Sequence, residues 1–175
     1  MSSRTTIVGS SLRGRLKLHY VHGLTRRYLK VHTLTFGTRL TNITRSLRHR
    51  DPDLALALAS AQVQDWKGGT RIASCLDDFN RHWARRLLGA NAALLLVTDG
   101  LDRDEHGELT RTAAQLRLFA RQIVWLNPLL RFEHFEPRAG GVRALLPFVD
   151  RFLPVHNLAS LADLATVLRA APSPR

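Results

Sequence analysis

Two short segments of this 175-residue chain carry oxygen-bearing side chains of the kind that bind hard metal ions. Thr70 follows a pair of glycines in the segment KGGT at 67–70, and Asp99 follows the apolar run LLLVT at 94–98. A neutral hydroxyl can bind Mg²⁺ directly, and a carboxylate can act through a bound water, because this ion prefers oxygen ligands and retains several waters. The glycines permit a tight bend beside the ion. The pair predicts part of a cation site, although no acidic cluster from an earlier strand completes it.

Each of these residues also has a purely structural interpretation. Thr70 could cap the N-terminus of a helix that starts at Arg71, since threonine is a preferred N-cap residue. The Asp99-Gly100 pair could form an ordinary turn after a strand. Both alternatives stay open, and capping does not exclude metal binding.

Other polar and aromatic residues near these segments have simpler roles. We expect Asp102 and Asp104 on a solvated loop, where they could substitute as carboxylates. Cys75 falls among apolar helical positions and is expected to be inert core. Trp66 and Trp125 are expected to be packing residues.

Strands and helices alternate along the chain, which predicts the elements that position these residues. The strands are expected at 30–36, 40–44, 92–97, 123–126 and 150–155. The helices are expected at 12–28, 51–63, 70–83, 105–121, 137–146 and 158–170. This alternation predicts an α/β fold with a doubly wound, mostly parallel sheet and helices on both faces. Ligands of such folds bind outside the carboxyl ends of the strands, where Thr70 and Asp99 are expected.

The charge of the chain is concentrated in its first part. The net charge is +12, and residues 1–50 contain nine Arg, Lys17 and Lys30 but no Asp or Glu. A basic face of this kind could bind nucleic acid or another polyanion. The single cysteine excludes an internal disulfide, and no apolar run reaches the ~18 residues of a membrane span. Since the start also lacks a signal peptide, we expect a soluble, cytoplasmic protein.

Six segments together resemble the von Willebrand factor A (VWA) domain of CoxE-like proteins over about residues 20–170. They are FGTRL at 36–40, RHRDPD at 48–53, DWKGGTRI at 65–72, VTDGLDR at 97–103, VWLNPL at 124–129 and LPVHNL at 153–158. The resemblance implies a VWA fold with a metal-ion-dependent adhesion site (MIDAS) for Mg²⁺ or Mn²⁺. It also implies an accessory role in maturing a molybdenum-containing carbon monoxide dehydrogenase or a related enzyme. The implied partners are this client and a MoxR-type AAA+ ATPase.

The metal site of the family has three parts, of which this chain matches two. Thr70 matches the threonine after paired glycines, and Asp99 matches the aspartate at the end of the fourth strand. The first part is Asp-x-Ser-x-Ser at the end of the central first strand. Here Ile7 stands where the aspartate is expected and Gly9 where the first serine is expected, so only Ser11 fits. The implied ligand set is therefore Thr70, Asp99 and Ser11 in a degenerate site.

The missing part falls in the acid-free start of the chain. We therefore divide the chain into an atypical basic segment at 1–18 and a VWA domain at 19–172. The start could be frame-shifted or truncated and joined to an authentic domain, or the whole could be a degenerate VWA domain that binds partners without metal.

Three classes of function follow. The leading hypothesis is a non-enzymatic protein-interaction module in assembly or maturation machinery. The alternatives are a basic domain that binds nucleic acid or another polyanion and a metal-dependent phosphoester hydrolase that uses Asp99. The hydrolase hypothesis lacks support from a P-loop or an activated nucleophile.

Overall fold

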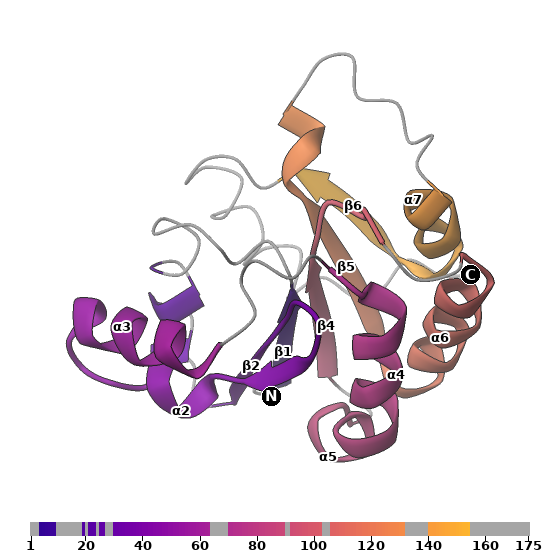
Figure 1. Cartoon of the computed structure of the whole chain (residues 1–175). Helices are drawn as coiled ribbons and strands as arrows, with labels where there is room; N and C mark the ends of the chain where they lie inside the picture. The colour runs from indigo at the N-terminus through magenta and orange to yellow at the C-terminus, as the bar shows by residue number, and fades with distance from the viewer. Residues whose placement is uncertain are drawn as a thin grey trace.

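The computed structural model describes residues 4–9, 19, 21–23, 25, 26, 30–63, 70–89, 92–102, 106–131 and 140–154. These residues form a six-stranded sheet with helices on both faces (Figure 1). The strands are β1 (Arg4–Gly9), β2 (Val31–Phe36), β3 (Leu40–Asn42), β4 (Ala92–Val97), β5 (Gln122–Asn127) and β6 (Arg151–Pro154). The helices are α2 (Thr44–Leu47), α3 (Pro52–Gln62), α4 (Ile72–His82), α5 (Ala84–Leu87), α6 (His106–Phe119) and α7 (Gly140–Leu145), with short 3₁₀ turns η1 (Pro128–Arg131) and η2 (Leu146–Phe148).

The strand order is β3-β2-β1-β4-β5-β6. All neighbouring strands are parallel except β2 and β3, which are antiparallel. The chain moves from β1 to β2 on one side and later returns to β4 on the other side of β1. The carboxyl ends of β1 and β4 therefore flank the topological switch point, where α/β sheets bind their ligands.

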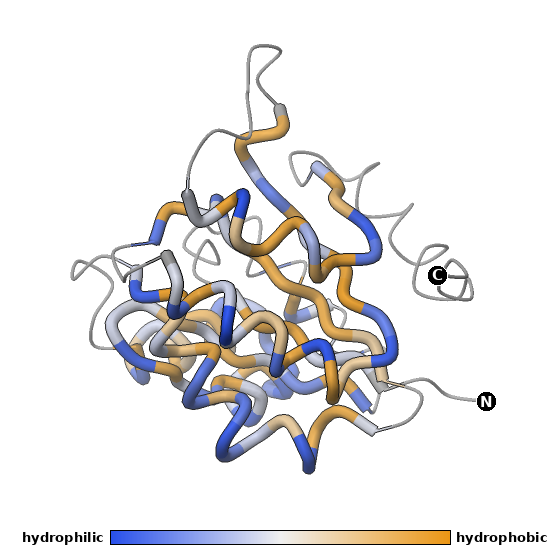
Figure 2. The backbone as a smooth tube through the Cα atoms, turned by 90° about the vertical axis from the view of Figure 1, so that its right-hand side faces the viewer, coloured by the Kyte–Doolittle hydropathy of each residue, from blue (hydrophilic) through white to orange (hydrophobic). Residues whose placement is uncertain are grey.

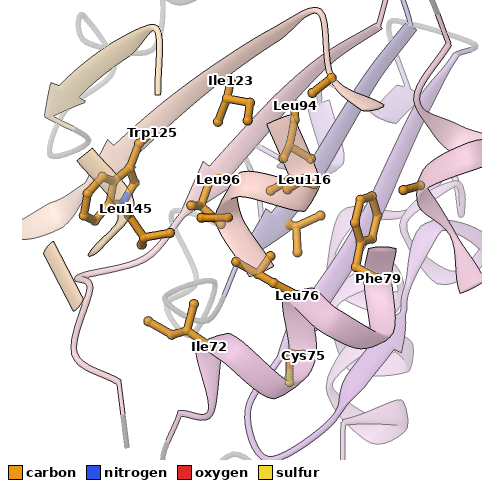
Figure 3. Packing of buried hydrophobic residues seen from close by; sticks show 14 of the residues in the cluster. Ile72, Cys75, Leu76, Phe79, Leu94, Leu96, Leu116, Ile123, Trp125 and Leu145 are labelled. Carbon is orange, nitrogen blue, oxygen red and sulfur yellow. The ribbon is translucent and has the colours of Figure 1, made fainter. Parts of the chain in front are cut away.

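The sheet is buried between two apolar layers. On one face, α4, α6 and α7 pack against the strands through residues that include Leu76, Phe79, Leu116 and Leu145 (Figure 3). On the other face, Leu47 of α2 and Leu56 of α3 pack over Ile7 of β1. Strands buried on both faces read as continuous apolar runs, and Figure 2 shows apolar residues gathered along the inner strands.

The predicted fold class is confirmed: the sheet is mostly parallel and doubly wound. The strands expected at 30–36, 92–97 and 123–126 form with small shifts at their ends. Asp51 begins α3 as expected, and its carboxylate accepts a hydrogen bond from the Leu54 backbone N–H at 3.0 Å. The helix expected at 158–170 and most of the helix expected at 12–28 lie outside the described residues, although residues 19, 21–23, 25 and 26 are helical.

The first strand occupies the middle of the sheet, although it belongs to the segment 1–18 that the sequence sets apart. Thr5 of β1 pairs with Val31 of β2 and with Ala93 of β4. These six residues therefore join the two halves of the sheet. In the described part of the chain, no helix has the length and apolar composition of a membrane span.

Candidate functional site

The loop that follows β4 holds Asp99 in a fixed turn. Its half-buried carboxylate accepts a hydrogen bond from the Leu101 backbone N–H at 3.1 Å. The preceding hydroxyl, on Thr98, accepts one from the Gly100 backbone N–H at 3.2 Å. Such local side-chain bonds are typical of turns built on Asp and Thr. The turn predicted from Asp99-Gly100 is therefore present.

Gly100 is required at the next position for two reasons. Its φ of +80° lies in the left-handed region that other residues rarely adopt. A Cβ there would also lie 2.9 Å from Cγ2 of Val142 and 3.1 Å from the ring of Trp125. On the neighbouring helix α7, a Cβ at Gly141 would meet the carbonyl oxygen of Gly100. The two glycines let α7 approach the backbone of the loop.

Two residues of β5 hold the same loop by hydrogen bonds to its backbone. The indole Nε1–H of the fully buried Trp125 donates to the carbonyl oxygen of Thr98 at 2.9 Å. The Asn127 amide donates to the carbonyl oxygen of Asp99 at 3.2 Å. The side-chain oxygen of Asn127 accepts a hydrogen bond from the backbone N–H of Leu129 at 2.8 Å, at the start of η1. Trp125 is confirmed as a packing residue, and it also positions the Asp99 turn.

The segment that carries Thr70 is tied to the Asp99 loop by Asp102. The helix α4 begins at Ile72, and no side chain at its N-cap position Arg71 makes a capping bond. The two oxygens of Asp102 instead accept hydrogen bonds from the N–H groups of Ile72 at 2.7 Å and Ala73 at 3.2 Å. Thr70 is therefore not the N-cap of this helix, and that structural alternative is wrong. A carboxylate at a helix N-terminus is also favoured by the helix dipole.

A second bond fixes the approach to α4. The Arg71 N–H donates to the carbonyl oxygen of Gly37, directly after β2, at 3.0 Å. The Sγ of the buried Cys75 lies 3.8 Å from the same oxygen, as expected for a packed core thiol. The half-buried Thr70 is therefore held at the carboxyl edge of the sheet, between the ends of β2 and β4.

The first strand brings no metal ligand to this edge among its described residues. Ile7 is fully buried opposite Leu95, four positions before Asp99, so position 7 lies inside the sheet. The strand ends at Gly9, opposite Val97. A Cβ at Gly9 would meet the carbonyl oxygen and the Cβ of Val97, so this position accommodates no side chain. Ser11 lies outside the described residues.

These donors can be compared with what a magnesium ion requires. Mg²⁺ needs near-octahedral oxygen coordination and is usually held by one or two carboxylates plus waters and substrate groups. At this edge the described residues offer the carboxylate of Asp99 and the hydroxyl of Thr70, since both oxygens of Asp102 cap α4. Nowhere in the described ranges do three or more His, Cys, Asp or Glu side chains form a group that could hold a metal. The described residues therefore supply only part of a metal site.

Asp102 lies on a loop as expected, but its half-buried carboxylate caps α4 instead of facing solvent, and the sequence predicted neither this role nor that of Asn127. Asp102 acts on a helix far away in the sequence, so no local pattern marks it as a cap. Asn127 carried a local signal: an asparagine between a strand and a proline is a common turn residue.

One comparison concerns the sequence. A family model described as "VWA domain containing CoxE-like protein" matches residues 8–161. No curated protein sequence matches the chain.

Comparison with solved structures shows the fold. The conserved hypothetical protein BatB from Bacteroides thetaiotaomicron is 13% identical with a TM-score of 0.60, over 94% of this chain and 97% of that chain. Proximal thread matrix protein 1 from the mussel byssus is 11% identical with a TM-score of 0.61, over 95% of this chain. The chain spans about half of the mussel protein, 47% of its length.

A further structure of the mussel protein is described as having a zinc-occupied MIDAS motif. It is 10% identical with a TM-score of 0.54, over 95% of this chain and 47% of that chain. At such identities the likeness extends to the fold alone.

Proposed function

Because the chain belongs to the family of VWA-domain-containing CoxE-like proteins, we propose that it is a protein-interaction module that binds its partner at the carboxyl edge around Asp99. VWA-type domains are generally non-catalytic interaction modules. The edge lies at the switch point of the sheet, where α/β folds bind their ligands.

The observation that carries the proposal is the way in which Asp99 is held. Its backbone carbonyl accepts from Asn127, and the carbonyl before it accepts from the buried Trp125. Its side chain is nevertheless only half-buried. A carboxylate on a fixed backbone at the surface is preorganised for a partner, because little conformational freedom is lost on binding.

We propose that Asp99 contacts a basic group of the partner directly. The proposed contact is made without an ion, by the half-buried carboxylate of Asp99 itself. Charge-assisted hydrogen bonds between a carboxylate and Arg or Lys are short and strong. Arg can form two parallel N–H···O bonds to the same carboxylate. The experiment therefore compares binding in the presence and absence of Mg²⁺ or Mn²⁺.

The proposed partner is a MoxR-type AAA+ ATPase, and the proposed client is a carbon monoxide dehydrogenase or related molybdenum enzyme. The support is membership of the CoxE-like family, for which these partners are expected. In this role the chain would act as an accessory factor during maturation of the enzyme.

A pull-down with the MoxR-type ATPase of the same genome tests the proposal. It is run with the intact chain in EDTA and in Mg²⁺. We expect capture in both conditions, loss of capture in Asp99→Ala, and unchanged capture in Glu108→Ala. Glu108 is a matched control because it is an exposed carboxylate in the first turn of α6. Equal capture of the two variants would contradict the proposal.

The hydrolase alternative has its own test. We expect no turnover of a panel of phosphoesters in the presence of Mg²⁺ or Mn²⁺. Turnover that is lost in Asp99→Ala would replace the interaction module by a phosphoester hydrolase.

A further inference from the structure

The helix α3 carries an apolar stripe on its exposed face. Leu54, Ala57, Leu58 and Ala61 are all exposed, with 44% of Leu54 and 41% of Leu58 accessible to solvent. They follow the spacing i, i+3, i+4, i+7, which places them on one side of a helix. A surface helix normally presents charged or polar residues there.

The opposite face of α3 makes the contacts that pack this helix against the sheet. Ala55, Leu56 and Ala59 are buried, and Leu56 and Ala59 belong to the core on that side of the sheet. The ends of the helix are also secured, by the Asp51 cap and by a hydrogen bond of 2.9 Å between Ser46 and Gln62. The stripe is therefore not part of the packing of the described domain.

A group of basic residues lies at the N-terminal end of this stripe. The Arg26 guanidinium donates to the carbonyl oxygen of Arg50 at 2.8 Å, which brings two exposed arginines together. Arg45 of α2 is exposed as well, and α2 leads into α3. The first 50 residues contain no Asp or Glu. Figure 1 shows α2 and α3 together at the margin of the molecule, away from α6 and α7.

We propose that this α3 surface, the stripe of Leu54, Ala57, Leu58 and Ala61 with the arginines at its end, binds an acidic amphipathic helix of a partner protein. The stripe spans two turns, about 10 Å, which matches the i, i+3, i+4, i+7 contacts of one helix on another. The arginines complement glutamates or aspartates on the partner. This surface is separate from the edge around Asp99.

The alternation of large and small residues favours a helix over an anionic membrane. Ala57 and Ala61 let a second helix axis approach closely, since the interaxial distance of 8–10 Å depends on the side chains at the contact. A lipid surface gains mainly from large apolar side chains, of which the stripe has Leu54 and Leu58.

The test uses a synthetic probe and matched variants of the full chain. The probe is a fluorescein-labelled helical peptide with leucines at heptad positions and glutamates beside them, and binding is followed by fluorescence anisotropy. In the control peptide every glutamate is replaced by lysine. Leu58→Gln and Arg50→Glu change the α3 surface, whereas Leu118→Gln changes an 83% exposed leucine on α6.

We expect the acidic peptide to bind and the lysine peptide to bind at least about tenfold more weakly. Leu58→Gln and Arg50→Glu should each weaken binding of the acidic peptide by about tenfold. Leu118→Gln and Asp99→Ala should leave it unchanged, which separates this surface from the edge. Circular dichroism of each variant checks that it is folded.

Three outcomes would overturn the proposal. They are no binding of the acidic peptide, equal binding of both peptides, and equal loss in Leu58→Gln and Leu118→Gln. Binding to phosphatidylserine vesicles that Leu58→Gln abolishes, without peptide binding, would assign the surface to a membrane instead.

Discussion

The carboxylate of Asp102 caps α4 across 30 residues of sequence, with its Oδ1 2.7 Å from the backbone nitrogen of Ile72. Its other oxygen accepts from the next N–H group, that of Ala73. Because Asp102 follows Asp99 on one loop and Ile72 follows Thr70 on another, this single side chain holds together the two segments of the candidate site.

Asp102→Ala should therefore destabilise the domain and weaken partner binding although Asp99 is intact. Loss of an N-cap costs about 1–2 kcal/mol in the free energy of unfolding. Urea unfolding measures this loss, and a pull-down measures binding. Asp102→Asn keeps an acceptor oxygen and should lose less stability. If Asp102→Ala unfolds like the wild-type chain, the cap does not stabilise α4.

Divalent metal should stabilise the chain very little. A ligand at a concentration equal to its Kd contributes only about 0.4 kcal/mol, and weaker binding contributes less. We therefore expect the melting temperature to be the same in millimolar Mg²⁺ or Mn²⁺ as in NaCl of equal ionic strength. A rise that disappears in Asp99→Ala would show that residues beyond the described ones complete a metal site.

The close approach of β1 and β4 predicts an opposite effect of two glycine substitutions. Gly9→Ser supplies the serine of the family motif, yet its Cβ would meet the backbone of Val97. Overpacking against rigid backbone costs about 3 kcal/mol. Gly107→Ala, on an exposed turn of α6 with open space around it, should stabilise by about 0.5–1 kcal/mol. Thermal or urea unfolding of both variants checks the contrast, and an unharmed Gly9→Ser would refute the register at Gly9.

A half-buried ion pair secures the end of the sheet opposite to the site. Two nitrogens of Arg117 lie 2.9 and 3.1 Å from the two oxygens of Asp150. One of these oxygens also accepts from the Ile123 N–H at 2.7 Å. Asp150→Ala removes the carboxylate from the half-buried guanidinium and from the Ile123 N–H, and should cost about 2 kcal/mol. In the control Asp77→Ala, loss of the pair with Arg81, whose side chain is 66% exposed, should cost under about 1 kcal/mol. Equal losses in urea unfolding would contradict this ranking.

The sequence predicted the elements whose signals are local. The run Ala92–Val97 is apolar because its strand is covered on both faces, and Asp51-Pro52 marks a helix start because both residues act within one turn. The cap from Asp102 could not be predicted, since it depends on two loops meeting in space. The helix α5 could not be distinguished from α4 in the sequence, because it has only four residues and a single residue, Trp83, separates the two helices.

The candidate site likewise has residues whose position the sequence predicts and one whose position it does not. Asp99 and Thr70 were placed at the carboxyl edge because the order of strands and helices alone puts them there. The position of Ile7 was not predicted, because a sequence motif does not give the strand register. The pairing of Ile7 with Leu95 moves that residue into the core, and Gly9 becomes the end of the strand.

The central position of β1 also determines at what point during synthesis the sheet can be completed. Thr5 pairs with Val31 on one side and with Ala93 on the other, so one of the two partners of this strand is synthesised much later than the strand itself. Until β4 has emerged, one edge of this strand has no partner. Such non-local pairing slows folding, because a long loop must close before the contacts are made. The nascent chain therefore completes its sheet only after the loop that carries Thr70 has been synthesised.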